Sequence, residues 1–170
     1  MTVVPEAVLI AGANGAGKTT LAREVLHVRY PGAGFLNADE IQREGGEFAH
    51  PVAAGRELIR RLGELVSRRR TFAVETTLSS RNYVSRVQAW SAAGYSTTLH
   101  FIELPSADYA VSRVARRVAA GGHAVLEADI RRRFERGLEM FGTIYKPLVD
   151  RWYHWLSDDR GLRLDDYSSK

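Results

Sequence analysis

The sequence predicts an α/β fold: a mostly parallel sheet with helices on both faces. Short apolar runs alternate with longer segments whose apolar residues recur at helical spacing. The first run, residues 7–11, is apolar throughout and lies between Pro5 and Gly12, which is typical of a strand buried on both faces of a parallel sheet. With 45% apolar residues in 170, we expect one domain over residues 1–170 with one core.

The same periodicity predicts the other elements. Strands are expected within residues 34–38, 71–75 and 95–104, and helices over 18–29, 51–69, 83–93, 106–120 and 127–145, with Ser106 as an N-cap. The polar residues 44–50 should form a flexible loop, and the segment from Trp152 onward has no clear period. The expected inward-facing residues are Leu21, Val25 and Val28 in the first helix and Phe134, Leu138, Phe141 and Tyr145 in the last, with Pro147 beyond its end.

Charge and composition exclude several classes of ligand, metal site and partner. The net charge is +4, and all 24 basic residues except Lys18, Lys146 and Lys170 are arginine, which suits phosphate-bearing ligands. No RRM, KH, helix-turn-helix or zinc pattern is present, so nucleic acid is an unlikely main partner. The lack of cysteine excludes disulfides and thiolate metal sites. Without an apolar run of membrane-spanning length or room for an export signal, we expect a cytoplasmic protein with no membrane partner.

A phosphate-binding loop follows the first expected strand. Its GxxxxGK[ST] motif consists of Gly12, Ala13, Asn14, Gly15, Ala16, Gly17, Lys18 and Thr19. Glycines let successive N–H groups turn toward phosphate oxygens, the helix N-terminus adds its positive dipole end, and Lys18 adds a mobile charge. The Thr19 hydroxyl is the expected Mg²⁺ ligand, with Thr20 beside it at the nucleotide. The sequence therefore predicts a P-loop NTPase fold that binds ATP or GTP with Mg²⁺.

The residues at the ends of the next two expected strands help to distinguish an NTPase motor from a kinase. Neither NADE (37–40) nor VETT (74–77) is the apolar run ending in Asp that is usual in NTPase motors. A kinase needs a carboxylate near the γ-phosphate to accept the proton of the incoming hydroxyl. Asp39 is placed for that role, although it could equally cap a short helix that begins at Glu40.

Glu75, at the end of the third expected strand, could order the substrate or a Mg²⁺-bound water. Thr76 and Thr77 follow it directly. Their place at a strand end favours a functional role, and the alternative is that they are only strand formers or a turn cap.

Three arginines on one helix suggest a helical lid. Arg113, Arg116 and Arg117 share a face by their spacing, and Gly121 and Gly122 follow as a possible hinge. On a closing segment such arginines would bind phosphate bidentately and exclude water. The alternative is a solvated helix face.

Further basic and aromatic residues have weaker signals. His123 after the hinge could contact phosphate or substrate, or have no special role. In the run 131–133 one arginine, Arg133, is expected to face the nucleotide, whereas the run 68–70 closes a helix C-terminus, where the dipole favours cations. Phe141, Trp152, Tyr153 and Trp155 are expected in the core and not at a stacked base.

Five blocks, in this order, carry a family resemblance: GANGAGKT, NADEI, FAVETTLSSR, GYSTTLHFIEL and RVARRVAAGGHAVLEADIRRRF. Over residues 7–150 the chain resembles the zeta-toxin family of P-loop kinases, in particular its short bacterial branch, often labelled predicted ABC-type ATPase. The resemblance implies a phosphotransferase whose best-known relatives phosphorylate a sugar hydroxyl of UDP-N-acetylglucosamine, and a possible antitoxin partner that covers the nucleotide site.

The resemblance also implies residue roles. Asp39 becomes the catalytic base, Lys18 and Thr19 hold phosphate and Mg²⁺, Glu75 and Thr77 fall in the substrate-side motif, and Arg113 resembles an arginine that stabilises the transferred phosphoryl group. The chain departs from the long toxins in having His123 where they carry a second phosphate-contacting arginine, and in lacking their substrate-side insertions. Other hypotheses are a nucleotide-binding regulatory module without kinase activity and a polynucleotide kinase or RNA-binding protein.

Overall fold

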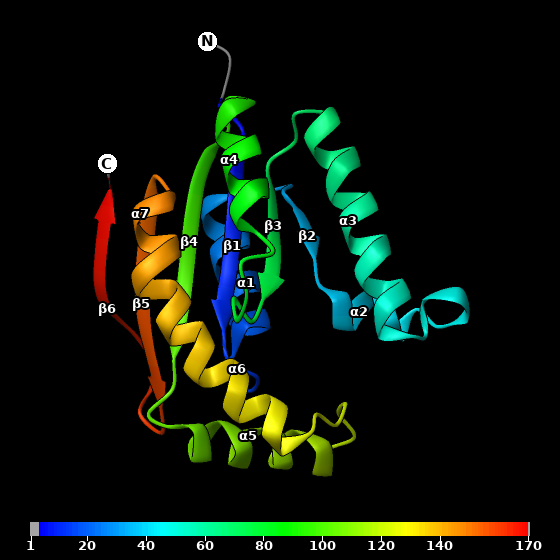
Figure 1. Cartoon of the computed structure of the whole chain (residues 1–170), viewed down its shortest axis with the longest axis vertical. Coiled ribbons are helices and arrows are strands. Elements are labelled where there is room, and N and C mark those ends of the chain that lie inside the picture. Colours follow the sequence, from blue (N-terminus) through cyan, green and yellow to red (C-terminus); the bar gives the residue numbers. More distant parts are fainter. Residues whose placement is uncertain (1–3, 170) are drawn as a thin grey trace.

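A six-stranded sheet runs through the molecule (Figure 1). The computed structural model describes residues 4–169. The strand order is β2-β3-β1-β4-β5-β6, with β6 antiparallel to β5 and the other neighbours parallel. The strands are β1 (Glu6–Gly12), β2 (Gly34–Leu36), β3 (Phe72–Thr76), β4 (Ser96–Glu103), β5 (Arg151–Asp158) and β6 (Gly161–Ser169). The predicted α/β fold with a mostly parallel sheet is confirmed.

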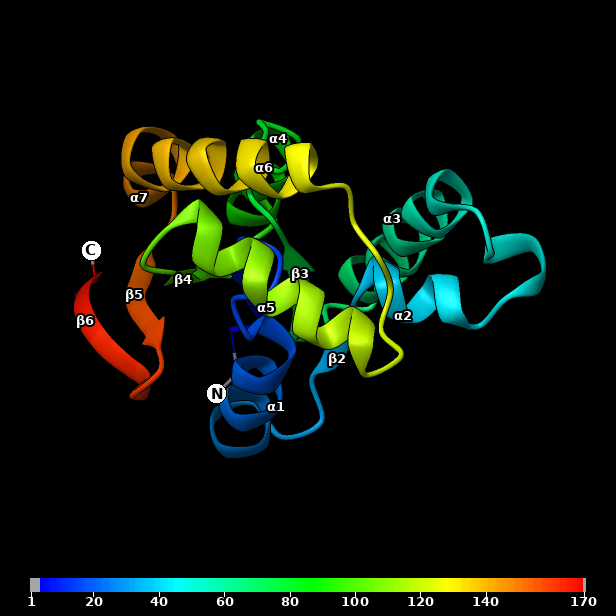
Figure 2. The same ribbon diagram turned by 90° about the horizontal axis from the view of Figure 1, so that it is seen from below.

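Helices cover both faces of this sheet. They are α1 (Lys18–Arg29), α2 (Ala38–Arg43), the 3₁₀ helix η1 (Gly46–Phe48), α3 (Pro51–Ser67), α4 (Val84–Ala92), α5 (Ala107–Ala119), α6 (Glu127–Met140), the π-helix η2 (Phe141–Tyr145) and α7 (Lys146–Leu148). In Figure 2, α4 and α6 lie on one face and α1 on the other, with α5 crossing between α6 and α1. Figure 1 shows that α5 lies at the carboxyl ends of the parallel strands.

Burial on both faces explains why β1 is apolar throughout. Residues 7–11 are all 0% exposed. Ala7, Leu9 and Ala11 belong to the core under α3, α4 and η2, whereas Val8 and Ile10 pack on the α1 face. The central strand is thus fixed from both sides, which fixes the phosphate loop that follows it.

Two inward-facing predictions were wrong. Val28 is 81% exposed because the cluster that covers Leu21 and Val25, built from β4 and α5, does not reach the last turn of α1. Leu138 is 38% exposed because Gly137 takes the inward position of that turn of α6. The prediction for Phe141 and Tyr145 was correct: both are buried.

The chain after α6 differs most from expectation. A single helix was predicted over 127–145 with Pro147 beyond it, but α6 passes into a π-helix and Pro147 lies within α7. Strands β5 and β6 were not predicted. The aromatic residues of β5 are only partly buried: Trp152 packs against Phe141 on one face, and Trp155 packs with His100 on the other.

Smaller differences lie before α3. The strand expected over 34–38 ends at Leu36, because Asn37 caps α2 and Ala38 is already helical. The loop expected at 44–50 contains η1. Within residues 4–169, no helix combines the length and apolar character needed to cross a bilayer.

Candidate active site

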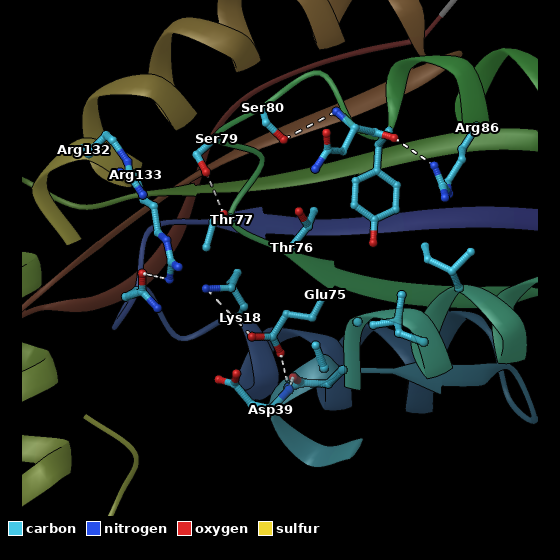
Figure 3. Close-up of a pocket in the computed structure, with 18 residues that line it drawn as sticks. Lys18, Asp39, Glu75, Thr76, Thr77, Ser79, Ser80, Arg86, Arg132 and Arg133 are labelled. Carbon is cyan, nitrogen blue, oxygen red and sulfur yellow. Dashed lines mark hydrogen bonds and ion pairs between the residues drawn. The ribbon is translucent and has the colours of Figure 1, made fainter. Parts of the chain in front are cut away.

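Polar residues from three strand ends meet at one edge of the sheet. Lys18 follows β1, Asp39 follows β2, and Glu75 lies near the end of β3 (Figure 3). They line a cavity of about 730 Å³, which we call the main cavity. Its lining is Asn14, Lys18, Asn37, Ala38, Asp39, Gly55, Leu58, Ile59, Glu75, Thr76, Thr77, Ser79, Ser80, Asn82, Tyr83, Arg86, Arg132 and Arg133. The parallel sheet therefore brings together residues from far apart in the chain at its carboxyl edge.

The phosphate loop has the backbone that its glycines allow. Gly12, Gly15 and Gly17 have φ of +145°, +81° and +94°. A Cβ on Gly12 would lie 2.5 Å from the carbonyl oxygen of Ile102, so no other residue fits there. Gly17 is the N-cap of α1, and no side chain of residues 4–169 caps this helix, so its first N–H groups are left for an anion.

Lys18 is held in the mouth of this loop. Its side chain is buried, and Nζ donates to the carbonyl oxygen of Ala13 (2.9 Å) and lies 3.8 Å from Oε1 of Glu75. Burial lowers the pKa of the ammonium group, while the carboxylates of Glu75 and Asp39 act in the opposite direction. An anionic phosphate would favour the charged form further.

The side chain of Glu75 joins three groups of the site. Its Oε2 accepts hydrogen bonds from the Thr19 hydroxyl (2.8 Å) and from Nδ2 of Asn37 (2.9 Å). The hydroxyl and carboxylate are the hard oxygen ligands that Mg²⁺ prefers. Residues 4–169 contain no cluster of three or more acidic, His or Cys residues that could hold a metal alone. This set fits a Mg²⁺ ion bound together with nucleotide phosphates, as in P-loop proteins.

Asn37, and not Asp39, caps α2. Its Oδ1 accepts a hydrogen bond from the backbone N–H of Asp39 (2.8 Å), and the helix begins at Ala38 and not at Glu40. The proposed capping role of Asp39 was therefore wrong. Its half-buried carboxylate faces the main cavity and a smaller pocket of about 170 Å³, which it lines with Gln42, Arg43, Ala49 and His123.

Helix α6 brings Arg133 to the phosphate loop. Nη1 of Arg133 donates to Oδ1 of Asn14 (3.2 Å), and both residues line the main cavity (Figure 3). The positive charges of Arg117 and Arg133 both lower the pKa of Lys18, so each guanidinium lies within electrostatic reach of its ammonium group.

The arginines of α5 are arranged differently from one another. Arg113 lies against the phosphate loop, since a Cβ on Gly15 would be 3.1 Å from the Cβ of Arg113. The guanidinium of Arg113, however, donates through Nη1 to Oγ of Ser157 (3.3 Å). Arg117 donates to the carbonyl oxygen of His123 (3.0 Å). Neither lines the main cavity, and Arg116 is exposed. Thr20 is also exposed, on the first turn of α1.

One wall of the main cavity was not expected. Beyond Thr77 it is formed by Ser79, Ser80, Asn82, Tyr83 and Arg86. Burial raises the pKa of Tyr83 to about 12, so its hydroxyl stays protonated at neutral pH. In the sequence, the run of hydroxyl and amide residues TTLSSRN, which begins at the last residue of β3, indicates such a wall. The wall is rich in hydrogen-bonding groups, which suits a polar ligand.

Comparisons with known proteins agree with this fold. A family model described as AAA domain (AAA_33) matches residues 8–141. An uncharacterized protein of Haemophilus influenzae is 24% identical over 135 residues, which are 76% of this chain and 92% of that protein. A structure of the PezAT chromosomal toxin-antitoxin system of Streptococcus pneumoniae has a TM-score of 0.72 at 14% identity and covers 98% of this chain and 72% of that one.

A second similar structure is the crystal structure of AvrRxo1-ORF1:-ORF2 with ATP. It has a TM-score of 0.68 at 17% identity, and the match covers 98% of this chain and 61% of that one. At these identities the likeness is one of fold. The predicted resemblance to zeta-toxin P-loop kinases is confirmed at that level: the chain has a kinase-like P-loop fold.

Proposed function

Because the chain belongs to the AAA domain family AAA_33, whose kinase-like P-loop fold it has, we propose that it is a kinase. The donor is ATP or GTP with Mg²⁺, and the acceptor is a hydroxyl of a small molecule. The observation that carries the proposal is the position of the Asp39 carboxylate. It shares the main cavity with Lys18, next to a phosphate loop, while Asn37 serves as the helix cap.

Each residue has a task in the transfer. The loop amides and Lys18 bind the β- and γ-phosphates, and Asn14 orients Arg133 toward the same region. Asp39 accepts the proton of the incoming hydroxyl as its oxygen attacks the γ-phosphorus, and the bond to the nucleoside diphosphate breaks. Thr19, with Glu75 beside it, would hold a Mg²⁺ ion that would neutralise charge on the phosphates. Arg113 and Arg117 supply further positive charge when the lid closes over the nucleotide.

The main cavity is the acceptor site in this proposal. Thr77, Ser79 and Ser80 offer hydroxyl groups, and the guanidinium of Arg86, which donates to the carbonyl oxygen of Asn82, lines the same cavity as Lys18. A polyhydroxylated acceptor with an anionic group near Arg86 suits this lining. UDP-N-acetylglucosamine is the first candidate, with an antitoxin as the possible protein partner.

A transfer assay with a panel of hydroxyl acceptors and Mg²⁺·ATP tests the proposal. We expect Asp39→Asn to lower kcat for the accepted compound by about 10²- to 10⁴-fold, the usual contribution of a general base. Glu40→Gln is the matched control, because Glu40 neighbours Asp39 in α2 but does not line the main cavity. Equal rates for wild type and Asp39→Asn would remove Asp39 as the base.

A second candidate function is a nucleotide-binding regulatory module. The bond of Arg113 to Ser157, which directs its guanidinium away from the main cavity, favours it. Binding of Mg²⁺·ATP without transfer to any compound of the panel would support this alternative and count against the kinase.

A further inference from the structure

The loop between β3 and α4, residues 77–83, is held by a buried tyrosine from another part of the chain. Tyr145, in η2, is 0% exposed. Its hydroxyl donates to the carbonyl oxygen of Ser80 (2.8 Å) and accepts from the backbone N–H of Tyr83 (3.3 Å). Within residues 4–169, the other hydrogen bonds of this loop that involve a side chain join residues two to four apart. Leu78 of this loop is also buried in the core, and Tyr145 supplies the long-range hydrogen bonds of the loop.

Helix α6 meets the same loop at a second point. Gly137 is buried, and a Cβ on it would lie 3.0 Å from the carbonyl oxygen of Thr77. The absence of a side chain thus lets α6 approach the start of the loop closely, while Tyr145 binds its later part. The continuous segment α6–η2 contacts the loop at both positions.

The loop needs such support. Leu78, 1% exposed, has φ of +55°, a left-handed conformation that is unfavourable for a residue with a Cβ. Strain of this kind persists only where surrounding contacts fix it. Ser79 and Ser80, which follow Leu78, line the main cavity (Figure 3).

We propose that Tyr145 is a positioning residue for the acceptor: it fixes the geometry of the loop whose hydroxyl groups line the acceptor side of the main cavity. The inference rests on the proposed function. Tyr145 is fully buried and does not line the cavity, so it acts through the loop and not on the reacting atoms. The helix that precedes it also carries Arg133, which bonds Asn14 of the phosphate loop, so one segment connects the two substrate sites.

Tyr145→Phe tests this role, because it removes the hydroxyl and keeps the ring. The carbonyl of Ser80 and the N–H of Tyr83 then lose their shared partner, and the loop samples other conformations. We expect KM for the accepted panel compound to rise about 5- to 10-fold, the effect of losing one or two hydrogen bonds. The Kd of Mg²⁺·ATP should stay within about twofold, since the groups of the phosphate loop are untouched.

Tyr95→Phe is the matched control. Tyr95 is also a buried tyrosine, and its hydroxyl bonds backbone carbonyls, those of Leu65, Val66 and Arg70, outside the main cavity. We expect this variant to lose stability comparably and to leave KM for the acceptor unchanged. Equal KM values for Tyr145→Phe and Tyr95→Phe would overturn the proposal, because Tyr145 would then be structural only.

Hydrogen exchange separates this proposal from the proposed function. In the protein without ligands, the amides of residues 79–83 should exchange about tenfold faster in Tyr145→Phe than in Tyr95→Phe. If no panel compound accepts a phosphoryl group, the kinase proposal fails, and the exchange rates still decide whether Tyr145 holds the loop. Equal rates would overturn it. Should Tyr145→Phe not fold, Gly137→Ala, which pushes against the carbonyl of Thr77, must raise exchange in the same loop.

Discussion

A buried histidine makes the stability of this protein depend on pH. His100 in β4 is 3% exposed, and its Nδ1 accepts a hydrogen bond from Nε1 of Trp155 (3.2 Å). Burial, together with the charges of Arg29 and Arg151, lowers the pKa of its imidazole to about 3. The native state therefore keeps the ring neutral at a pH where the unfolded chain, with an ordinary histidine pKa of about 6.5, becomes protonated.

The direction and the size of the change in unfolding free energy with pH follow from these two pKa values. The unfolded state binds more protons, so the stabilising contribution is fully present above about pH 6.5 and is lost as pH falls toward 3. Each pH unit in this window costs about 1.4 kcal/mol. Between pH 7 and pH 5 the loss is about 2 kcal/mol, because protonation of the unfolded state only sets in near 6.5.

Urea unfolding at pH 7 and pH 5, monitored by tryptophan fluorescence, measures this loss. The control is His100→Gln, which does not titrate and keeps an acceptor for the indole N–H of Trp155. Other histidines contribute equally to both proteins, so the difference between them isolates His100. Equal losses of unfolding free energy by wild type and His100→Gln between the two pH values would contradict a lowered pKa of His100.

Three further outcomes are expected. Gly12→Ala should cost at least about 2 kcal/mol of stability in urea melts and abolish ATP binding, because the new Cβ meets the Ile102 carbonyl and φ is +145°. The control Gly63→Ala, in α3 with open space around it, should gain about 0.5–1 kcal/mol of stability. Equal effects of the two substitutions would contradict the steric requirement for glycine at position 12. Arg133→Ala should weaken ATP binding about 5- to 10-fold in calorimetry, and an unchanged Kd would exclude it from the nucleotide site. Removal of Mg²⁺ with EDTA should abolish phosphoryl transfer but leave the unfolding temperature unchanged; transfer that persists would show that Thr19 and Glu75 hold no catalytic metal.

The phosphate loop and its flanking elements could be predicted because their signals are local. The helix expected over 18–29 has those bounds in the structure. A continuous apolar run, a glycine motif and a proline after the helix specify this region without reference to the rest of the chain. The convergence of Lys18, Asp39 and Glu75 could be anticipated in the same way, because parallel strands end at one edge of their sheet.

Side-chain direction and long-range contacts could not be predicted. Helical spacing put Arg113 and Arg117 on one face, but the direction of the Arg113 guanidinium depends on Ser157, a residue of β5. β5 itself shows no alternation, because its residues are partly buried on both faces of the sheet. The anchor at Tyr145 depends on the π-helix and on partners more than sixty residues away, and no local pattern reports such contacts.

The cradle formed by the phosphate loop and Lys18 is tested most directly by titrating Mg²⁺·ATP, and then Mg²⁺·GTP, into the folded protein and its Lys18→Ala variant by isothermal calorimetry. We expect the wild type to bind one of the two and the variant to bind it about 10- to 100-fold more weakly, the effect of losing a charge-assisted hydrogen bond. Thermal unfolding should show both proteins folded. No binding by the folded wild type, or equal binding by the two proteins, would contradict the nucleotide site.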